Sequence, residues 1–293
     1  EYMSEFLMKL KVDFAFKQVM RNENARLGFL SAMLQMPPED IRETRLLDTH
    51  LNKLHKDDKL GILDVRVCLN SDAEIDIEIQ LAPFPAWTKR ALFYLSKMYA
   101  SQLKEGEEYH RMKKCISISI LDFALFSGQK EFYSRFHLWE DTRRLLYSDQ
   151  MELHVLELPK LPEELKEGAS DMLLWAKFIN AEKKEELDML SEKNPYIKEA
   201  CETLQEISQD RATQLEYLAR EKAIRDHNYL MAEADQRGER RGIEIGEQRG
   251  LKQGVEHTAK NLIRLGAETD FIAAATNLSQ ERIEDLRKEC PRS

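Results

Sequence analysis

The sequence predicts an α/β protein with a mixed sheet flanked by helices, followed by an all-helical C-terminal region. Residues 73–81 alternate isoleucine and leucine with acids and an amide, which is typical of a strand with one apolar face. Residues 61–69 form a second, mostly apolar strand candidate. Beyond Pro162, apolar residues recur at helical spacing instead.

Two helices accompany these strands. Residues 12–35 carry apolar side chains at helical spacing, and the pair Pro37–Pro38 ends the helix. Two prolines break the chain after residue 81, and an amphipathic helix is expected over residues 86–104. The first helix precedes both strands and the second follows them.

Three further segments complete the expected sheet. Residues 115–121 alternate isoleucine with small residues and predict a third strand. Residues 132–138 and 151–158 are strand candidates too, although their apolar and aromatic runs fit a core helix equally well. The element order is therefore helix, strand, strand, helix, strand.

The first two strands bring acids together. Residues 70–72 form a natural hairpin loop, and a turn centred on it places Asp64 directly opposite Glu78. Opposed like charges destabilise a sheet, and a carboxylate in an apolar strand carries a desolvation cost. A hard divalent cation offsets both, so Asp64 and Glu78 are candidate metal ligands. For Glu74 and Asp76 the simpler interpretation is an acidic face toward water.

Asp64 and the triplet Glu78-Ile79-Gln80 resemble the metal site of the PD-(D/E)xK nuclease superfamily, an Asp on one strand followed by Glu-x-Lys on the next. Gln80 stands where lysine is usual, and Leu63 stands where proline is usual. The surrounding text is similar to the recombination-promoting nuclease / putative transposase family. The segments that carry this likeness are 11–17, 87–94, 99–103, 106–109, 115–121 and 153–160. The resemblance covers roughly the first 160 residues, and more loosely the rest.

The resemblance implies a metal-dependent DNA endonuclease of a mobile-element-associated family. Asp64 and Glu78 would bind Mg²⁺ or Mn²⁺, and Asp64, Glu78 and Gln80 would form the catalytic set. Gln80 can orient a water molecule by hydrogen bonds but supplies no positive charge. A second cation or a basic side chain must then supply it.

Five residues are possible supporting or phosphate-contacting groups. Lys89 and Arg90 begin the helix after the hairpin, and Lys17 lies on the first helix; all three also fit ordinary surface bases. Asp13 either lies beside the metal or caps the first helix. Tyr94 either contacts a phosphate or belongs to the core.

Composition limits the other possibilities. The formal net charge of −9 argues against DNA binding by bulk electrostatics, although it leaves room for a local basic cleft. The four cysteines show no Cys-x-x-Cys spacing, so neither a zinc site nor a disulfide framework is expected. With no run of 18 apolar residues and no signal pattern, we expect a cytoplasmic protein without a membrane partner. Because the chain opens on Glu1, we expect it to be processed or truncated.

We expect four regions along the chain. They are a nuclease-like domain at 1–160, a helical region at 161–235, a glycine repeat at 236–257 and a small helical segment at 258–293. The last segment reads as a helix-turn-helix in which acids outnumber bases, which favours a structural or dimer-contact role over DNA recognition.

The glycine repeat runs from Gly238 to Gly254 with one glycine every four residues. Each interior glycine costs a helix about 1 kcal/mol relative to alanine, so five of them disfavour an isolated helix. Two interpretations stay open. The glycines form a smooth ridge through which a homo-oligomer assembles, or they form a polar linker whose repeat reflects expansion of a short unit.

Three functions remain in view. The first is a Mg²⁺-dependent DNA endonuclease of the bacterial cytoplasm that is associated with recombination. The second is a catalytically weak or inactive DNA-binding or regulatory protein that self-associates through its C-terminal helices. The third is an interaction protein without a metal. The ordered set Asp64, Glu78 and Gln80 favours the first.

Overall fold

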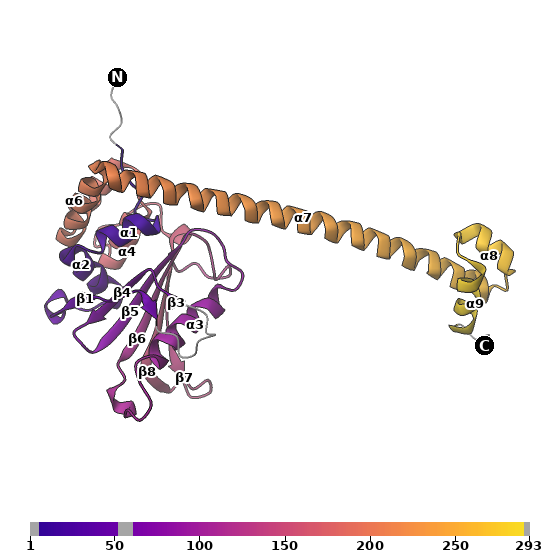
Figure 1. The fold of residues 1–293 in the computed structure, drawn as a ribbon, viewed down its shortest axis with the longest axis horizontal. Helices are drawn as coiled ribbons and strands as arrows, with labels where there is room; N and C mark the ends of the chain where they lie inside the picture. The colour runs from indigo at the N-terminus through magenta and orange to yellow at the C-terminus, as the bar shows by residue number, and fades with distance from the viewer. Residues whose placement is uncertain (1–5, 52–60, 290–293) are drawn as a thin grey trace, which may run out of the picture. The chain divides into compact units, whose positions relative to one another are not determined.

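The computed structural model describes residues 6–51 and 61–289. By its contacts the chain divides into two compact units, Glu1–Ala223 and Ile224–Ser293 (Figure 1). The first unit contains a six-stranded sheet in the order β1-β4-β5-β6-β8-β7. These strands are β1 Thr44–Leu46, β4 Val65–Leu69, β5 Ala73–Gln80, β6 Lys114–Leu121, β7 Tyr133–Trp139 and β8 Leu146–Glu157.

The sheet is mixed, which confirms the predicted fold class. The pairs β1–β4, β4–β5 and β7–β8 are antiparallel, whereas β5–β6 and β6–β8 are parallel. Both ambiguous segments, now β7 and β8, are strands. Two short strands, β2 His50–Leu51 and β3 Gly61–Ile62, pair separately from the main sheet.

Helices cover both faces of the sheet. Those of the first unit are α1 Asp13–Val19, α2 Glu23–Leu34, α3 Trp87–Ala100, α4 Asp171–Asn180, α5 Lys184–Ser191 and α6 Pro195–Gln209, with short 3-10 turns η1 Pro38–Asp40, η2 Tyr109–Arg111 and η3 Leu158–Lys160. Helix α3 packs on β6, where Leu95 and Met98 share a buried cluster with Cys115. Helix α2 lies on the opposite face, since the Tyr133 hydroxyl of β7 approaches the Met33 carbonyl of α2 at 3.5 Å.

The expected single helix over residues 12–35 is wrong, because the chain forms α1 and α2 with a break between them. Asn22 caps α2 by accepting a hydrogen bond from the backbone N–H of Ala25 at 3.1 Å. The buried guanidinium of Arg26 donates to the carbonyls of Met20 and Arg21 in the break. These groups satisfy the carbonyls that a continuous helix would have used.

The expected strand over residues 61–69 is also divided. Its first two residues belong to β3, and β4 begins only at Val65. The backbone N–H of Leu63 donates to the carbonyl of Thr49 at 2.9 Å, which directs this stretch away from β5. Asp64 therefore lies just before β4 and outside a regular strand.

Contacts distant in sequence fasten the N-terminus to the helices that follow the sheet. The backbone N–H groups of Met8 and Lys9 donate to Ser208 at 3.0 Å and Tyr217 at 3.2 Å. Helix α6 packs against α2 so closely that Gly28 faces the side chain of Tyr196. The compact unit that contains the sheet thus also includes helices α4 to α6. It includes the start of α7 as well, a helix that runs over Arg211–Arg264.

The second unit consists of the remainder of α7, α8 Thr269–Thr276 and α9 Gln280–Glu289. Its core is small and apolar, built on Ala259, Ile263, Ile272, Ile283 and Leu286. Helix α7 is continuous through the five glycines of the repeat, and a Cβ added at any of them would meet nothing within 4 Å. Across residues 6–51 and 61–289, no helix has both the length and the apolar content to span a membrane.

Two glycines in these helices should respond oppositely to alanine. At Gly28 the new Cβ would stand 2.1 Å from the Tyr196 Cβ, so α2 and α6 must separate, and we expect Gly28→Ala to lower the free energy of unfolding by about 1–3 kcal/mol. Gly242→Ala meets open space and should instead raise helix stability by about 1 kcal/mol. Denaturant unfolding followed by circular dichroism measures both, and a neutral Gly28→Ala would contradict the close packing.

Candidate active site

The β4–β5 hairpin places Asp64 next to Glu78. Val65 pairs with Ile77, so the register predicted from the loop holds, and Asp64 and Glu78 are the next residues beyond this pair. The Asp64 Oδ2 atom accepts a hydrogen bond from the backbone N–H of Ile79 at 3.4 Å. The Asp64 side chain thus bonds the backbone of β5 where the β4–β5 ladder ends.

Glu78 is buried beneath α3. Its side chain is 5% exposed, and its Oε1 atom lies 2.5 Å from an Nη atom of Arg90. The Arg90 guanidinium also lies over the rings of Phe84, Trp87 and Tyr94, with centroid distances of 5.5 to 5.9 Å. These cation–π contacts help to hold the Arg90 guanidinium beside the carboxylate.

Burial controls the protonation of Glu78. Loss of hydration raises the pKa of Glu78 to about 7, and the nearby charge of Asp64 acts in the same direction. Arg90 and Lys17 oppose this shift but offset only part of it. Glu78 is thus a carboxyl group whose ionised form needs more positive charge than its neighbours supply.

A chain of charges leads from Asp64 to helix α7. Lys17 of α1 lies 2.9 Å from Asp64 and 3.7 Å from Asp13. Asp13 in turn accepts two hydrogen bonds from the Arg220 Nε and one from an Nη atom, at 2.6 to 3.0 Å. Burial opposes ionisation of Asp13, but Arg220 and Lys17 outweigh it and lower its pKa. Val12, rather than Asp13, occupies the cap position of α1.

The other predicted residues are not part of this series of ion pairs. The Gln80 amide donates to the carbonyl of Ala82 at 3.0 Å. Lys89 is exposed and makes no ion pair with any residue in the described part of the chain. Tyr94 is buried and packs with Leu95 and Met98, so it serves the core beneath α3 as well as the ring set around Arg90.

Asp76 was not among the candidates, and the expectation that it faces water is wrong. It is 2% exposed, and its side chain lies on the face of β5 that also carries Glu78, the partner of Arg90 in α3. Its Oδ1 atom has no hydrogen-bond partner among the described residues. Burial, followed by repulsion from Glu78 and Asp64, raises its pKa well above the ordinary range. Glu74, two residues earlier, is partly buried and pairs with Arg66 at 2.6 Å.

These groups suit a hard divalent cation. Mg²⁺ takes oxygen ligands and commonly uses one or two carboxylates together with waters. Asp64 and Glu78 supply the carboxylates, and the orphaned buried oxygen of Asp76 lies on the same strand face. Within the described ranges no three His, Cys, Asp or Glu side chains already converge on one metal position. The arrangement therefore fits a cation held by two carboxylates with its remaining ligands from outside the protein.

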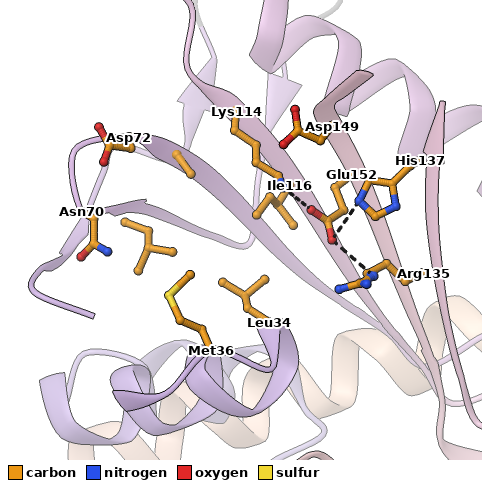
Figure 2. Close-up of a pocket in the computed structure, with 12 residues that line it drawn as sticks. Leu34, Met36, Asn70, Asp72, Lys114, Ile116, Arg135, His137, Asp149 and Glu152 are labelled. Atoms are coloured by element: carbon orange, nitrogen blue, oxygen red, sulfur yellow. Dashed lines mark ion pairs between the residues drawn. The ribbon is translucent and has the colours of Figure 1, made fainter. Parts of the chain in front are cut away.

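A second polar cluster lies on the opposite face of the sheet. Glu152 of β8 faces Lys114 at 2.5 Å, His154 at 3.0 Å, His137 at 3.4 Å and Arg135 at 3.7 Å. Figure 2 shows three of these side chains, Lys114, His137 and Arg135, converging on Glu152 at one side of a cleft of about 430 Å³. The buried His154 also lies 2.7 Å from the Tyr133 hydroxyl.

In this second cluster the negative charge of Glu152 is compensated by its neighbours. Burial works against ionisation of Glu152, yet His154 and Lys114 outweigh it and lower its pKa to about 2. Since its partners come from β6, β7 and β8, Glu152 ties three strands together. Polar residues at alternate positions of the apolar run 151–158 were the available sequence signal for it.

Comparison with known proteins gives one match. The family model described as "PD-(D/E)XK nuclease family transposase" matches residues 10–234, which includes the whole sheet, α1 to α6 and the first part of α7. The searches of curated proteins and of solved structures gave no match.

The raised pKa of Glu78 predicts a pH-dependent stability in EDTA. The unfolded chain releases this proton near pH 4.5 and the folded chain near pH 7, so stability should fall as pH rises between these values, by up to about 3 kcal/mol. Glu78→Gln should remove this part of the fall, whereas the part from Asp76 has the same sign and should remain. Denaturant titrations at pH 4.5, 5.5, 6.5 and 7.5 measure it, and equal slopes for both proteins would contradict the burial argument.

Proposed function

We propose that this chain, which belongs to the PD-(D/E)XK nuclease family transposases, is a metal-dependent DNA endonuclease that acts in recombination or in the movement of genetic elements. The observation that carries the proposal is the pair Asp64 and Glu78 at the end of the β4–β5 ladder, with Glu78 buried and short of positive charge. A surface hairpin with no ligand would leave both acids in water.

The cation, Mg²⁺ or Mn²⁺, would supply Lewis-acid chemistry and charge neutralisation at the phosphate. Asp64 and Glu78 would hold it. The hydrogen bond from the Ile79 N–H fixes the orientation of Asp64, and α3 excludes water from Glu78. Gln80, at the exit of β5, would orient a water molecule through its amide once that amide leaves the Ala82 carbonyl.

Positive charge for the phosphate would come from Arg90 and Lys17. Both already contact the acids, at 2.5 Å from Glu78 and 2.9 Å from Asp64. With Asp64 and Glu78 engaged as ligands, both side chains would be free to pair with the negatively charged phosphate. Asp13 would act as a positioning residue that aligns Lys17, and Tyr94 would support the Arg90 guanidinium. Lys89 has neither contact, so we assign it no role in the reaction.

We place this reaction on DNA in the bacterial cytoplasm. With a net charge of −9, binding must rely on local bases such as Lys17 and Arg90 rather than on the overall field.

One observation favours a second candidate, a DNA-binding or regulatory protein without cleavage activity. Lys17 and Arg90 already neutralise part of the charge of both acids, and the Gln80 amide is bonded to the backbone. A chain that has lost its metal would show the same contacts. The cleavage assay below separates the two candidates.

Cleavage should depend on both acids. With supercoiled plasmid we expect nicking in Mg²⁺ or Mn²⁺ but not in Ca²⁺ or EDTA. Asp64→Ala and Glu78→Ala should each lower the rate at least 100-fold, because each removes a ligand of the cation. Agarose-gel time courses measure the rates, and Asp72→Ala, an exposed acid in the loop of the same hairpin, is the matched control. Wild-type activity in both site variants would refute the assignment, and an inert wild type would favour the second candidate.

The two adjacent bases of α3 should differ. Arg90→Gln should reduce cleavage about 10–1000-fold, because it removes the cation over Glu78, whereas Lys89→Gln should remain within twofold of wild type. Single-turnover rates at saturating protein measure the difference without a contribution from DNA affinity. Equal losses in the two variants would show that α3 contributes only general charge.

We also propose that the segment Gly238 to Gly254 of α7 assembles the protein into a homo-oligomer. The five glycines leave open space on an exposed helix, and exposed apolar side chains such as Ile243 and Leu251 lie among them. A second helix could approach such a ridge closely. The other interpretation, a polar linker, needs no partner.

Leucine at three of these glycines separates the interpretations. If the ridge is an interface, the triple variant Gly242→Leu, Gly246→Leu, Gly250→Leu should block close approach and yield a smaller species, although each change raises helix propensity. Size-exclusion chromatography with light scattering measures the mass. The corresponding triple alanine variant is the control, and an unchanged mass with leucine would remove the interface proposal.

A further inference from the structure

Among the described residues, the buried acid Asp76 of the β4–β5 hairpin makes no ion pair, unlike its neighbours Glu78 and Asp64. Its side chain is 2% exposed, in the middle of β5 between β4 and β6. Glu78 has Arg90 at 2.5 Å and Asp64 has Lys17 at 2.9 Å, whereas the Oδ1 atom of Asp76 has no hydrogen-bond partner in the described ranges. A buried oxygen left in this state is costly, so a partner from outside the protein is expected.

The residues opposite Asp76 on the neighbouring strands do not provide a hydrogen-bond partner for its Oδ1 atom. Arg66 is its partner on β4, but the Arg66 guanidinium donates to Glu74 at 2.6 Å. Ser117 is its partner on β6 and is itself buried. The side of β5 that carries Asp76 also carries Glu78, because residues two apart in a strand share a face. The unpaired Oδ1 atom of Asp76 therefore belongs to the strand face of the proposed cation site.

We propose that Asp76 is the third acid of the cation site, where its carboxylate accepts hydrogen bonds from the hydration water of a divalent cation held by Asp64 and Glu78. The inference rests on the proposed function. An indirect contact suits the geometry, because these acids do not converge on one position in the described ranges. It also suits Mg²⁺ and Mn²⁺, since Mg²⁺ keeps several of its waters in protein sites.

A cation-free explanation competes with this one. The Nε atom of Arg66 also lacks a partner in the described part of the chain, and a single ordered water between Arg66 and Asp76 would satisfy both atoms. Under that explanation asparagine at position 76 keeps an acceptor for the water, and cation affinity does not change. Under the proposal, the lost charge weakens the cation's hydration shell.

Mn²⁺ binding to the full chain tests the proposal without reference to cleavage. Electron paramagnetic resonance of free Mn²⁺ gives the dissociation constant, and we expect Asp76→Asn to weaken binding at least tenfold, the size of effect that residues around a metal's ligands typically show. Asp72→Asn, an exposed acid in the loop of the same hairpin, removes the same charge and should stay within twofold of wild type. Binding by Asp76→Asn within twofold of wild type would overturn the proposal.

Thermal melting in EDTA tests whether Asp76→Asn damages the fold. Removing an unpartnered buried carboxylate should leave Asp76→Asn at least as stable as wild type when no cation is present. A variant that melts lower, or does not fold, would also overturn the proposal, because the carboxylate would then stabilise the protein by itself.

The double variant Asp64→Asn, Glu78→Gln separates this inference from the proposed function. If it binds Mn²⁺ as wild type does, the proposed site is wrong. If it loses Mn²⁺ while Asp76→Asn does not, only the role of Asp76 is wrong.

Discussion

The parallel pairing of β5 with β6 is the constraint on which the candidate site depends. It makes β5 a central strand, with β4 on its other side, so both edges of β5 are hydrogen-bonded to neighbouring strands. The acids that alternate along β5 lie on one face of the sheet, and Asp76 and Glu78 are buried there. Helix α3 brings Arg90 to Glu78 on this face, and Arg90 is the cation that this burial requires.

Two buried glutamates in one sheet show how differently this requirement can be met. Glu152 has four nitrogen-bearing neighbours and a pKa of about 2, which marks a group that the protein has already satisfied. Glu78 has one close cation and a pKa of about 7. The difference supports the proposed cation site on the face of the sheet that carries Glu78, because a buried carboxyl group without full compensation is costly unless a ligand binds to it. A cleft lies beside Glu152, yet the charge of this acid is already compensated by its neighbours.

The local parts of the fold were predictable and the nonlocal parts were not. Alternation in residues 73–81 and the loop at 70–72 were enough to give the hairpin and its register, since both signals lie within twenty residues. The break before Asp64 depends on Thr49, which is distant in sequence. The break at Asn22 is a local exception, because it depends on hydrogen bonds of Asn22 and Arg26 that a pattern of apolar spacing does not register. A period-two pattern does not show which face of a strand a distant helix will cover. The side chain of Asp76 was therefore expected to be exposed to water.

Several bonds of the first unit join residues about 200 positions apart, and they have a consequence for synthesis on the ribosome. Asp13 reaches its guanidinium partner 207 residues later in the chain. At about 5–20 residues per second, some 10–40 s pass between the emergence of these two side chains. During that interval the nascent chain holds Asp13 without Arg220. Completion of the nuclease-like fold is therefore a late event in translation, and ribosome-bound chains that stop short of α7 lack this fastening.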